Sequence, residues 1–299
     1  MSADKRKSVI VTGAAGLLGR FVAQRFATAG WNVTGMDRVA GLPTDDFDTA
    51  IVDLTDHCAS LDAISSVDCL VHCAAIPRPT GVDARTVFTT NMALMYNAVA
   101  AAEAHHIPRI VYASSFSVLG LPFAPQPVEI AFLPVDETHP VAPQDVYALS
   151  KWLGEEMIDA WCRRTKMPAV SLRLPWIQTA DSFPREVAPR RKTSESALDL
   201  WAYIDADDAA DAFLAASAAP IEGHERLFVA AADTYCDVAS TMLVSRHMAD
   251  TPLRQPLSGH RSMIDCRKAE TTLGFKACRS WRDYPIAETG QTAPAGENP

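Results

Sequence analysis

A glycine-rich turn directly after a short apolar run is the feature that most constrains this chain. The run 9–11 is typical of a buried strand, and Gly13, Gly16 and Gly19 follow it as an apolar helical pattern begins at Leu17. A strand, such a turn and a helix can surround a pyrophosphate with backbone N–H groups and a helix N-terminus. Glycines serve there because a side chain would block the tight turn or the approach of the phosphate. An ordinary strand–helix turn shows the same pattern, so motifs elsewhere in the chain are needed to distinguish it from a dinucleotide-binding turn.

The bulk properties indicate an ordinary globular protein. The chain has 299 residues, of which 48% are hydrophobic and 21% charged, enough for one large domain with a small lobe. A net charge of −9 argues against binding nucleic acid or an anionic membrane surface. The basic N-terminus runs straight into the first strand with no apolar export segment, so we expect a cytoplasmic protein. Seven cysteines without a CxxC pair predict reduced structural thiols, and no metal site is predicted.

Apolar runs alternate with longer helical patterns over the first two-thirds of the chain. The predicted strands are 9–11, 32–36, 50–52, 69–73, 109–113 and 170–174, and the predicted helices are 17–29, 84–105 and 147–166. Continuous apolar strands that alternate with helices are typical of a parallel sheet covered on both faces. We therefore predict an α/β fold with a Rossmann-like, doubly wound parallel sheet.

The amino-acid composition changes after Leu174, and this change suggests a second structural unit. Residues 175–200 are rich in proline, arginine and serine and show no clear periodicity. An alanine-rich helix introduced by 202–208 runs to about 219, and 227–231 is predicted as another strand. We predict a dinucleotide-binding domain of residues 1–174 plus about 203–232. A small C-terminal substrate-binding lobe would comprise about 175–202 plus 233–286. The polar tail 287–299 is predicted to be disordered.

Acidic and small residues follow the predicted strands where a dinucleotide would lie. Asp37 ends the second strand, where a carboxylate accepts hydrogen bonds from ribose hydroxyls and repels a 2′-phosphate, which favours NAD. Arg38 beside it could pair with that phosphate, so NADP stays open. Asp53 and Leu54 are expected near the adenine, although Asp53 serves equally well as a helix or turn cap. Small residues would let the backbone pass close to the cofactor at Cys73, Ala74 and Ala75.

Tyr147 and Lys151 are four residues apart and would share one face of a helix. An ammonium beside a phenol favours the phenolate and lowers a pKa that is normally about 10, which makes the tyrosine a general base for an alcohol. A serine cluster ends the strand 109–113, where Ser115, with Ser114 as second choice, could bind the substrate oxygen. A surface pair and turn-capping serines are the alternatives.

The glycine turn, the strand-end serines and Tyr-x-x-x-Lys, in this order, resemble the extended short-chain dehydrogenase/reductase family, particularly its NAD-dependent epimerase/dehydratase branch. The resemblance covers residues 7–284. It implies a catalytic triad in which Tyr147 exchanges a proton with a substrate hydroxyl, Lys151 also holds the nicotinamide ribose, and Ser115 orients the substrate oxygen. Asn91 matches a position near the cofactor, with a structural role as the alternative. The cofactor contacts expected in all are Gly13, Ala15, Gly16, Leu17, Leu18, Gly19, Asp37, Arg38, Asp53, Leu54, Cys73, Ala74, Ala75, Asn91, Tyr147, Lys151 and Pro175.

The substrate end departs from this resemblance. Nucleotide-sugar epimerases carry an arginine where this chain has Trp201 or Ala202, and the lobe is short, so we expect a smaller substrate. Phe116 replaces an acid that sugar-nucleotide dehydratases use, which argues against dehydration. Arginines in the insertion could bind a carboxylate or phosphate, or could form a solvated loop. Arg254 and Arg261 lie near another anion-binding position of the epimerases. The candidate substrate contacts are Ser114, Phe116, Ser117, Trp176, Arg190 and Arg191.

The sequence therefore predicts an NAD-dependent dehydrogenase that acts on a small sugar, sugar acid or polyol. The alternatives are a nucleotide-sugar epimerase that uses transient oxidation and a non-catalytic protein that senses NAD. The resemblance also implies a homodimer through helices 84–105 and 147–166, with core packing as the alternative explanation of their apolar residues. Those residues include Met92, Met95, Trp152, Met157 and Trp161.

Overall fold

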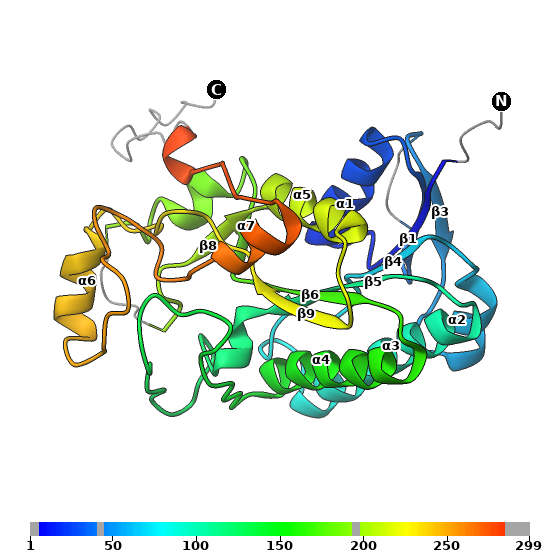
Figure 1. The fold of residues 1–299 in the computed structure, drawn as a ribbon, viewed down its shortest axis with the longest axis horizontal. Helices are drawn as coiled ribbons and strands as arrows, with labels where there is room; N and C mark the ends of the chain where they lie inside the picture. Colours follow the sequence, from blue (N-terminus) through cyan, green and yellow to red (C-terminus); the bar gives the residue numbers. More distant parts are fainter. Residues whose placement is uncertain (1–5, 41–44, 193–197, 285–299) are drawn as a thin grey trace, which may run out of the picture.

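Seven parallel strands form a central sheet in the computed structural model, which describes residues 6–40, 45–192 and 198–284 (Figure 1). Their order is β3-β2-β1-β4-β5-β6-β9, so the chain reverses direction across the sheet between β1 and β4. At such a reversal the connections that leave the carboxyl ends of the two neighbouring strands run to opposite faces of the sheet, and a crevice for a ligand is left between them. The strands are β1 (Ser8–Thr12), β2 (Asn32–Asp37), β3 (Asp48–Ile51), β4 (Cys69–His72), β5 (Ile110–Ser115), β6 (Ala169–Leu174) and β9 (His224–Phe228). The predicted doubly wound parallel sheet is confirmed.

Helices cover both faces of the sheet (Figure 1). On one face lie α1 (Leu17–Thr28) and α5 (Ala206–Ala218); on the other lie α2 (His57–Ala63), α3 (Ala84–Ala104) and α4 (Val146–Thr165). Alternate strand residues point to opposite faces, so Val9 and Val11 pack with Phe26 in one core while Ile10 packs with Trp161 in the other. Within the described residues, no helix combines the length and apolar character needed to cross a bilayer.

A third hydrophobic core lies beyond the carboxyl edge of the sheet. It gathers residues from the segments after β5, β6 and β9 around Trp201, Tyr203 and Tyr235. Its elements are the parallel pair β7 (Trp176–Gln178) and β8 (Tyr203–Asp205), a π-helical turn Phe183–Val187, α6 (Ser240–His247) and 3₁₀ turns at Phe116–Leu119 and Trp281–Asp283. The short helix α7 (Arg267–Leu273) packs instead against α5 and β9 in the first core. The two-domain division stays a prediction, and the tail 287–299 lies outside the described residues.

Two predicted elements differ in their bounds. The strand predicted at 227–231 is β9, His224–Phe228, and its apolar end leaves the sheet where the Ala231 N–H donates to Tyr203 O. The predicted helix to 219 is preceded by strand β8, and Asp205 then caps α5 by accepting from Asp207 N. An apolar run indicates that its residues are buried, but it does not indicate where. Residues in the third core are buried as fully as residues in the sheet, so the apolar run 227–231 could not show where the strand ends.

Candidate active site

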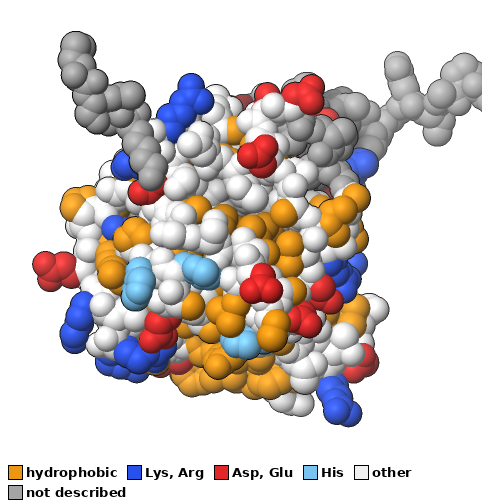
Figure 2. All heavy atoms as spheres, turned by 90° about the vertical axis from the view of Figure 1, so that its right-hand side faces the viewer, with side chains coloured by type: hydrophobic (Ala, Val, Ile, Leu, Met, Phe, Trp, Pro, Cys, Tyr) orange, Lys and Arg blue, Asp and Glu red, His pale blue; other side chains and the backbone are white. Residues whose placement is uncertain are grey.

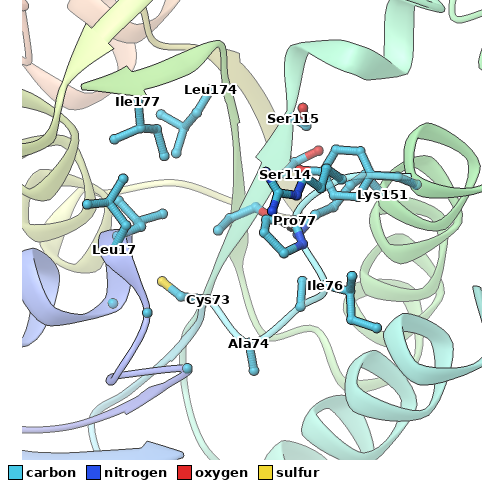
Figure 3. A pocket seen from close by; sticks show the side chains of 18 of the residues that line it. Leu17, Cys73, Ala74, Ile76, Pro77, Ser114, Ser115, Lys151, Leu174 and Ile177 are labelled. Carbon is cyan, nitrogen blue, oxygen red and sulfur yellow. Dashed lines mark hydrogen bonds between the residues drawn. The ribbon is translucent and has the colours of Figure 1, made fainter. Parts of the chain in front are cut away.

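A cavity of about 880 Å³ follows the carboxyl edge of the sheet. Its lining begins at the glycine turn and the end of β2, crosses the end of β4 and reaches the end of β5 and the first turns of α4. Figure 3 shows Leu17 on one side of this cavity and Lys151 on the other, with Cys73 and Ala74 between them. The structure therefore brings the glycine turn and the Tyr-x-x-x-Lys helix to one pocket.

The glycine turn brings the start of α1 to the pocket. Gly13 has φ +69°, and a Cβ atom there would lie 2.6 Å from the Ala74 backbone nitrogen, so the β4 loop can pack against the turn only if residue 13 is glycine. Gly16 is the N-cap of α1 and makes no side-chain capping bond. An uncapped helix start next to a tight turn of this kind fits the pyrophosphate of a dinucleotide.

Asp37 and Arg38 line the pocket where β2 ends. The Asp37 carboxylate accepts a hydrogen bond from Ala15 N at 3.0 Å, which fixes it against the glycine turn. Ala15 itself does not line the pocket and contributes through this bond. Asp53 lines the same region, but it accepts from the Thr55 N–H and hydroxyl, and these bonds lower its pKa. Its carboxylate therefore orders the turn before α2, as the capping alternative requires.

Ser115, Tyr147 and Lys151 converge at the opposite end of the pocket, and their exposed fractions are 7%, 8% and 4%. Ser115 ends β5, and its hydroxyl accepts from the Ser117 N–H. Tyr147 lies in the first turn of α4. Lys151 follows one turn later and donates from Nζ to Ala113 O at 2.7 Å. That ammonium also lies 5.7 Å from the centre of the Tyr147 ring.

Burial dominates the acid–base chemistry of these groups. It raises the pKa of Tyr147 to about 12, and a hydrogen bond with Ser115 opposes this rise. It lowers the pKa of the Lys151 ammonium to about 8. The sequence predicted that Lys151 would bring the pKa of Tyr147 down toward neutrality, and that expectation is wrong. Loss of hydration outweighs the nearby charge, and the ammonium is hydrogen-bonded to a carbonyl rather than to the phenol.

Asn91 supports the pocket from outside its lining. Its Oδ1 accepts from Ile76 N at 2.8 Å, while its Nδ2 donates to Ile76 O and to the Ser150 hydroxyl. Ser150 in turn donates to the carbonyl of Tyr147. The asparagine therefore joins the loop after β4 to the first turn of α4, which agrees with the structural alternative for this residue.

Ser114 connects the pocket to a buried ion pair that sequence reasoning missed. Its hydroxyl donates to Glu155 Oε1 at 2.6 Å, and Arg173 donates to both oxygens of Glu155 at 2.9 and 2.7 Å. Glu155 is fully buried and Arg173 is 3% exposed. Two signals could have revealed the pair: Glu155 follows Lys151 by one helical turn, and Arg173 interrupts an apolar strand.

The substrate candidates separate into two groups. Phe116, Trp176 and Arg190 line the pocket together with Ser114, whereas Ser117 and Arg191 do not. Pro175, a cofactor candidate, also lines it. The Arg191 side chain lies 3.6 Å from the Asp237 carboxylate and packs over Trp281. Neighbouring residues of an irregular segment point in different directions, so no periodicity separated Arg190 from Arg191. Pocket residues that the sequence did not single out include Arg78, Thr80, Phe123, Glu186, Leu198 and Asp199.

Comparisons with known proteins agree with this architecture. The model of the NAD dependent epimerase/dehydratase family matches residues 9–231. An L-arabinose 1-dehydrogenase (NAD(P)(+)) of Haloferax volcanii is 29% identical over 64% of this chain and 76% of its own length. A uronate dehydrogenase of Pseudomonas syringae pv. tomato is 27% identical over 59% of this chain and 60% of its own. A short-chain dehydrogenase/reductase superfamily protein from Agrobacterium tumefaciens with bound NAD superposes with a TM-score of 0.72 at 24% identity, covering 92% of this chain and 94% of that one.

Proposed function

Because the chain belongs to the NAD dependent epimerase/dehydratase family, we propose that it is an NAD-dependent dehydrogenase of a small sugar, sugar acid or polyol. The observation that carries this proposal is the convergence of Ser115, Tyr147 and Lys151 on a pocket whose other end is the glycine turn. The two relatives named as sugar dehydrogenases support the substrate class. A nucleotide-sugar epimerase would use the same residues and remains the second candidate.

Different residues of the pocket would hold different parts of NAD. Gly13, Gly16 and the start of α1 would hold the pyrophosphate, and Asp37 would accept hydrogen bonds from the adenosine ribose. Arg38 keeps NADP as the alternative, since a guanidinium there could pair with a 2′-phosphate. Lys151 would hold the nicotinamide ribose. When bound, NAD supplies the acceptor for a hydride from the substrate carbon.

The catalytic residues handle the proton of the substrate hydroxyl. Ser115 would orient that hydroxyl, and the Tyr147 phenolate would accept its proton as the carbon loses a hydride and becomes a carbonyl. Burial holds the pKa of Tyr147 at about 12 although the Ser115 hydrogen bond opposes the rise, so only a small fraction of the tyrosine is phenolate at neutral pH. In the reverse direction the phenol would return the proton.

Replacing Tyr147 with phenylalanine tests this assignment. With NAD and a panel of sugars and sugar acids, the wild type should accumulate NADH, and Tyr147→Phe should lose about 10²–10⁴-fold in kcat. The variant should still quench tryptophan fluorescence on adding NAD. Wild-type oxidation should accelerate from about pH 6 to about pH 8, because a phenol of pKa about 12 gains phenolate as pH rises. Above about pH 8 the gain should level off, because the Lys151 ammonium, with a pKa of about 8, loses its proton.

Tyr96→Phe on the exposed face of α3 is the matched control and should keep full activity, because Tyr96 is 59% exposed and outside the pocket. If the purified wild type carries tightly held NAD, interconverts UDP-sugars and releases no NADH, the dehydrogenase assignment is wrong and the epimerase assignment replaces it. A cofactor-sensing protein would bind NAD but would neither release NADH nor interconvert UDP-sugars.

We also propose that the protein is a cytoplasmic homodimer with α3 and α4 at its interface. Figure 2 shows hydrophobic side chains along its lower edge, the side on which these helices lie in Figure 1. Met95 and Trp161 are buried in the core, as the packing alternative requires, whereas Tyr96 is exposed. Partly exposed positions on the two helices are Met92, Trp152 and Met157.

A further inference from the structure

The loop between β4 and α3 places an arginine on the wall of the active-site pocket. We propose that this residue, Arg78, binds a carboxylate of the substrate and makes sugar acids the preferred substrates over neutral sugars. The inference rests on the dehydrogenase function proposed above and goes further by naming the substrate class and the residue that selects it. Neither the glycine turn nor the catalytic triad carries this information.

The charges around the pocket single out Arg78. Three arginines line the cavity: Arg38, Arg78 and Arg190. Arg38 lies beside Asp37 at the end of β2, and Arg190 stacks over Trp176 with its guanidinium 4.7 Å from the ring centre. Arg190 also has carboxylates on its own wall, since Asp199 and Glu186 line the same cavity. Burial raises the pKa of Asp199, and the charge of Arg190 opposes that rise.

Arg78, by contrast, makes no hydrogen bond or ion pair with any residue in the described part of the chain, and it is exposed to the pocket. The other cation at this end, Lys151, is hydrogen-bonded to Ala113 O and buried. An anionic group on the substrate would therefore meet one guanidinium whose charge is not already balanced. A guanidinium also matches a carboxylate geometrically, because its planar fork can donate two parallel hydrogen bonds.

The backbone holds Arg78 close to the catalytic turn of α4. Ile76 is bonded through its N–H and its carbonyl to the Asn91 side chain, and that side chain reaches α4 through Ser150. Pro79 favours an extended backbone at Arg78, and Pro77 fixes its own φ directly before it. Figure 3 shows Ile76 and Pro77 on the side of the pocket where Ser114 and Lys151 lie, across from Leu17. The backbone of Arg78 therefore lies at the catalytic end of the pocket, in a segment with little conformational freedom.

Two matched sugar series test the proposal. D-galacturonate, D-galactose and L-arabinose share their ring configuration and differ only in the substituent on C5, as do D-glucuronate, D-glucose and D-xylose. Each would be titrated calorimetrically into protein saturated with NADH, which permits sugar binding without oxidation, and kcat/KM would be measured with NAD. In at least one series the wild type should prefer the acid by about tenfold or more, the size expected of a charged hydrogen-bonded pair.

Arg78→Met should abolish that preference by weakening only the acid, and Arg78→Lys should restore part of it. Arg85→Met is the matched control, because Arg85 is an exposed arginine in the first turn of α3 that does not line the pocket. It should behave as the wild type. NADH affinity should be the same in all four proteins.

Three results would overturn the assignment. One is a wild type that binds the neutral sugars as well as the acids, or binds none of them. Another is an Arg78→Met variant that loses NADH affinity while its preference is unchanged, which would put Arg78 on the cofactor pyrophosphate. A third is a preference for D-galactose 6-phosphate over D-galacturonate. Failure of the dehydrogenase function itself looks different: no sugar would generate NADH, while the calorimetric preference would still be present.

Discussion

At the scale of single residues, Gly13 shows how one position joins sequence and site. Its positive φ closes the turn after β1, and its missing side chain lets the Ala74 backbone approach. Gly30 also has a positive φ, +84°, yet a Cβ atom there would meet no atom within 4 Å. A side chain would therefore strain the backbone at both positions, but only at Gly13 would it also collide with neighbouring atoms.

Alanine substitutions at these glycines should differ accordingly. Gly30→Ala should cost only the strain of a left-handed alanine, about 1–2 kcal/mol. Gly13→Ala should destabilise the protein more, because the β4 loop must move, and should weaken NAD binding. Urea unfolding and NAD titration of both variants measure the two effects. Equal stability losses with unchanged NAD affinity would contradict this account of the turn.

At the scale of elements, the Glu155–Arg173 pair ties α4 to β6 beneath the pocket. Glu155 accepts from Arg173 and from Ser114 and also lies 3.2 Å from the Arg226 guanidinium. A buried pair of this kind contributes little beyond a well-packed apolar pair, but removing one partner strands the other charge away from water. The interaction therefore constrains how α4 and β6 are placed, and through Ser114 it reaches the pocket.

Glu155→Gln should destabilise the protein by about 3–5 kcal/mol, because Arg173 would remain buried without a counter-charge. Glu103→Gln is the matched control: Glu103 pairs with Arg164 on the surface, where solvent screens the charges, and its loss should change the unfolding midpoint little. Urea denaturation compares the two. Similar midpoints for both variants would show that the buried pair is not what joins α4 to β6.

At the scale of the whole molecule, the outer faces of α3 and α4 are where a second copy would pack. Tyr96→Glu puts a charge on that face and should convert a dimer to a monomer in light scattering, because an unpaired charge in an apolar interface is costly to dehydrate. Met242→Glu on α6 is the matched control: Met242 is 47% exposed and away from these helices, and the change should leave the mass unaltered. A monomeric wild type at micromolar concentration would refute the interface.

Sequence patterns predicted the elements that depend on neighbours along the chain. The strands β1, β4, β5 and β6 were recognised because a sheet covered on both faces demands continuous apolar runs. The edge strand β3 is mostly exposed, and its prediction at 50–52 overlaps only the end of Asp48–Ile51. The short elements β7, β8, α2, α6 and α7 were missed, since a few residues hold too little periodicity. A capping residue that the sequence analysis did not use begins α2, where Asp56 accepts from Ala59 N. The placement of β9 was three residues late because the residues just beyond its end are buried as well, Val229 in the first core and Ala230 and Ala231 in the third.

The sequence by itself determined the parallel-sheet architecture, the glycine turn and the shared helix face of Tyr147 and Lys151. Spacing along the backbone settles all three. The tertiary structure alone decided that burial, not Lys151, dominates the pKa of Tyr147. It also decided that Arg191 lies against Asp237 and Trp281 while Arg78 lines the pocket. Hydration and charge pairing depend on segments far apart in the chain, which local patterns do not encode.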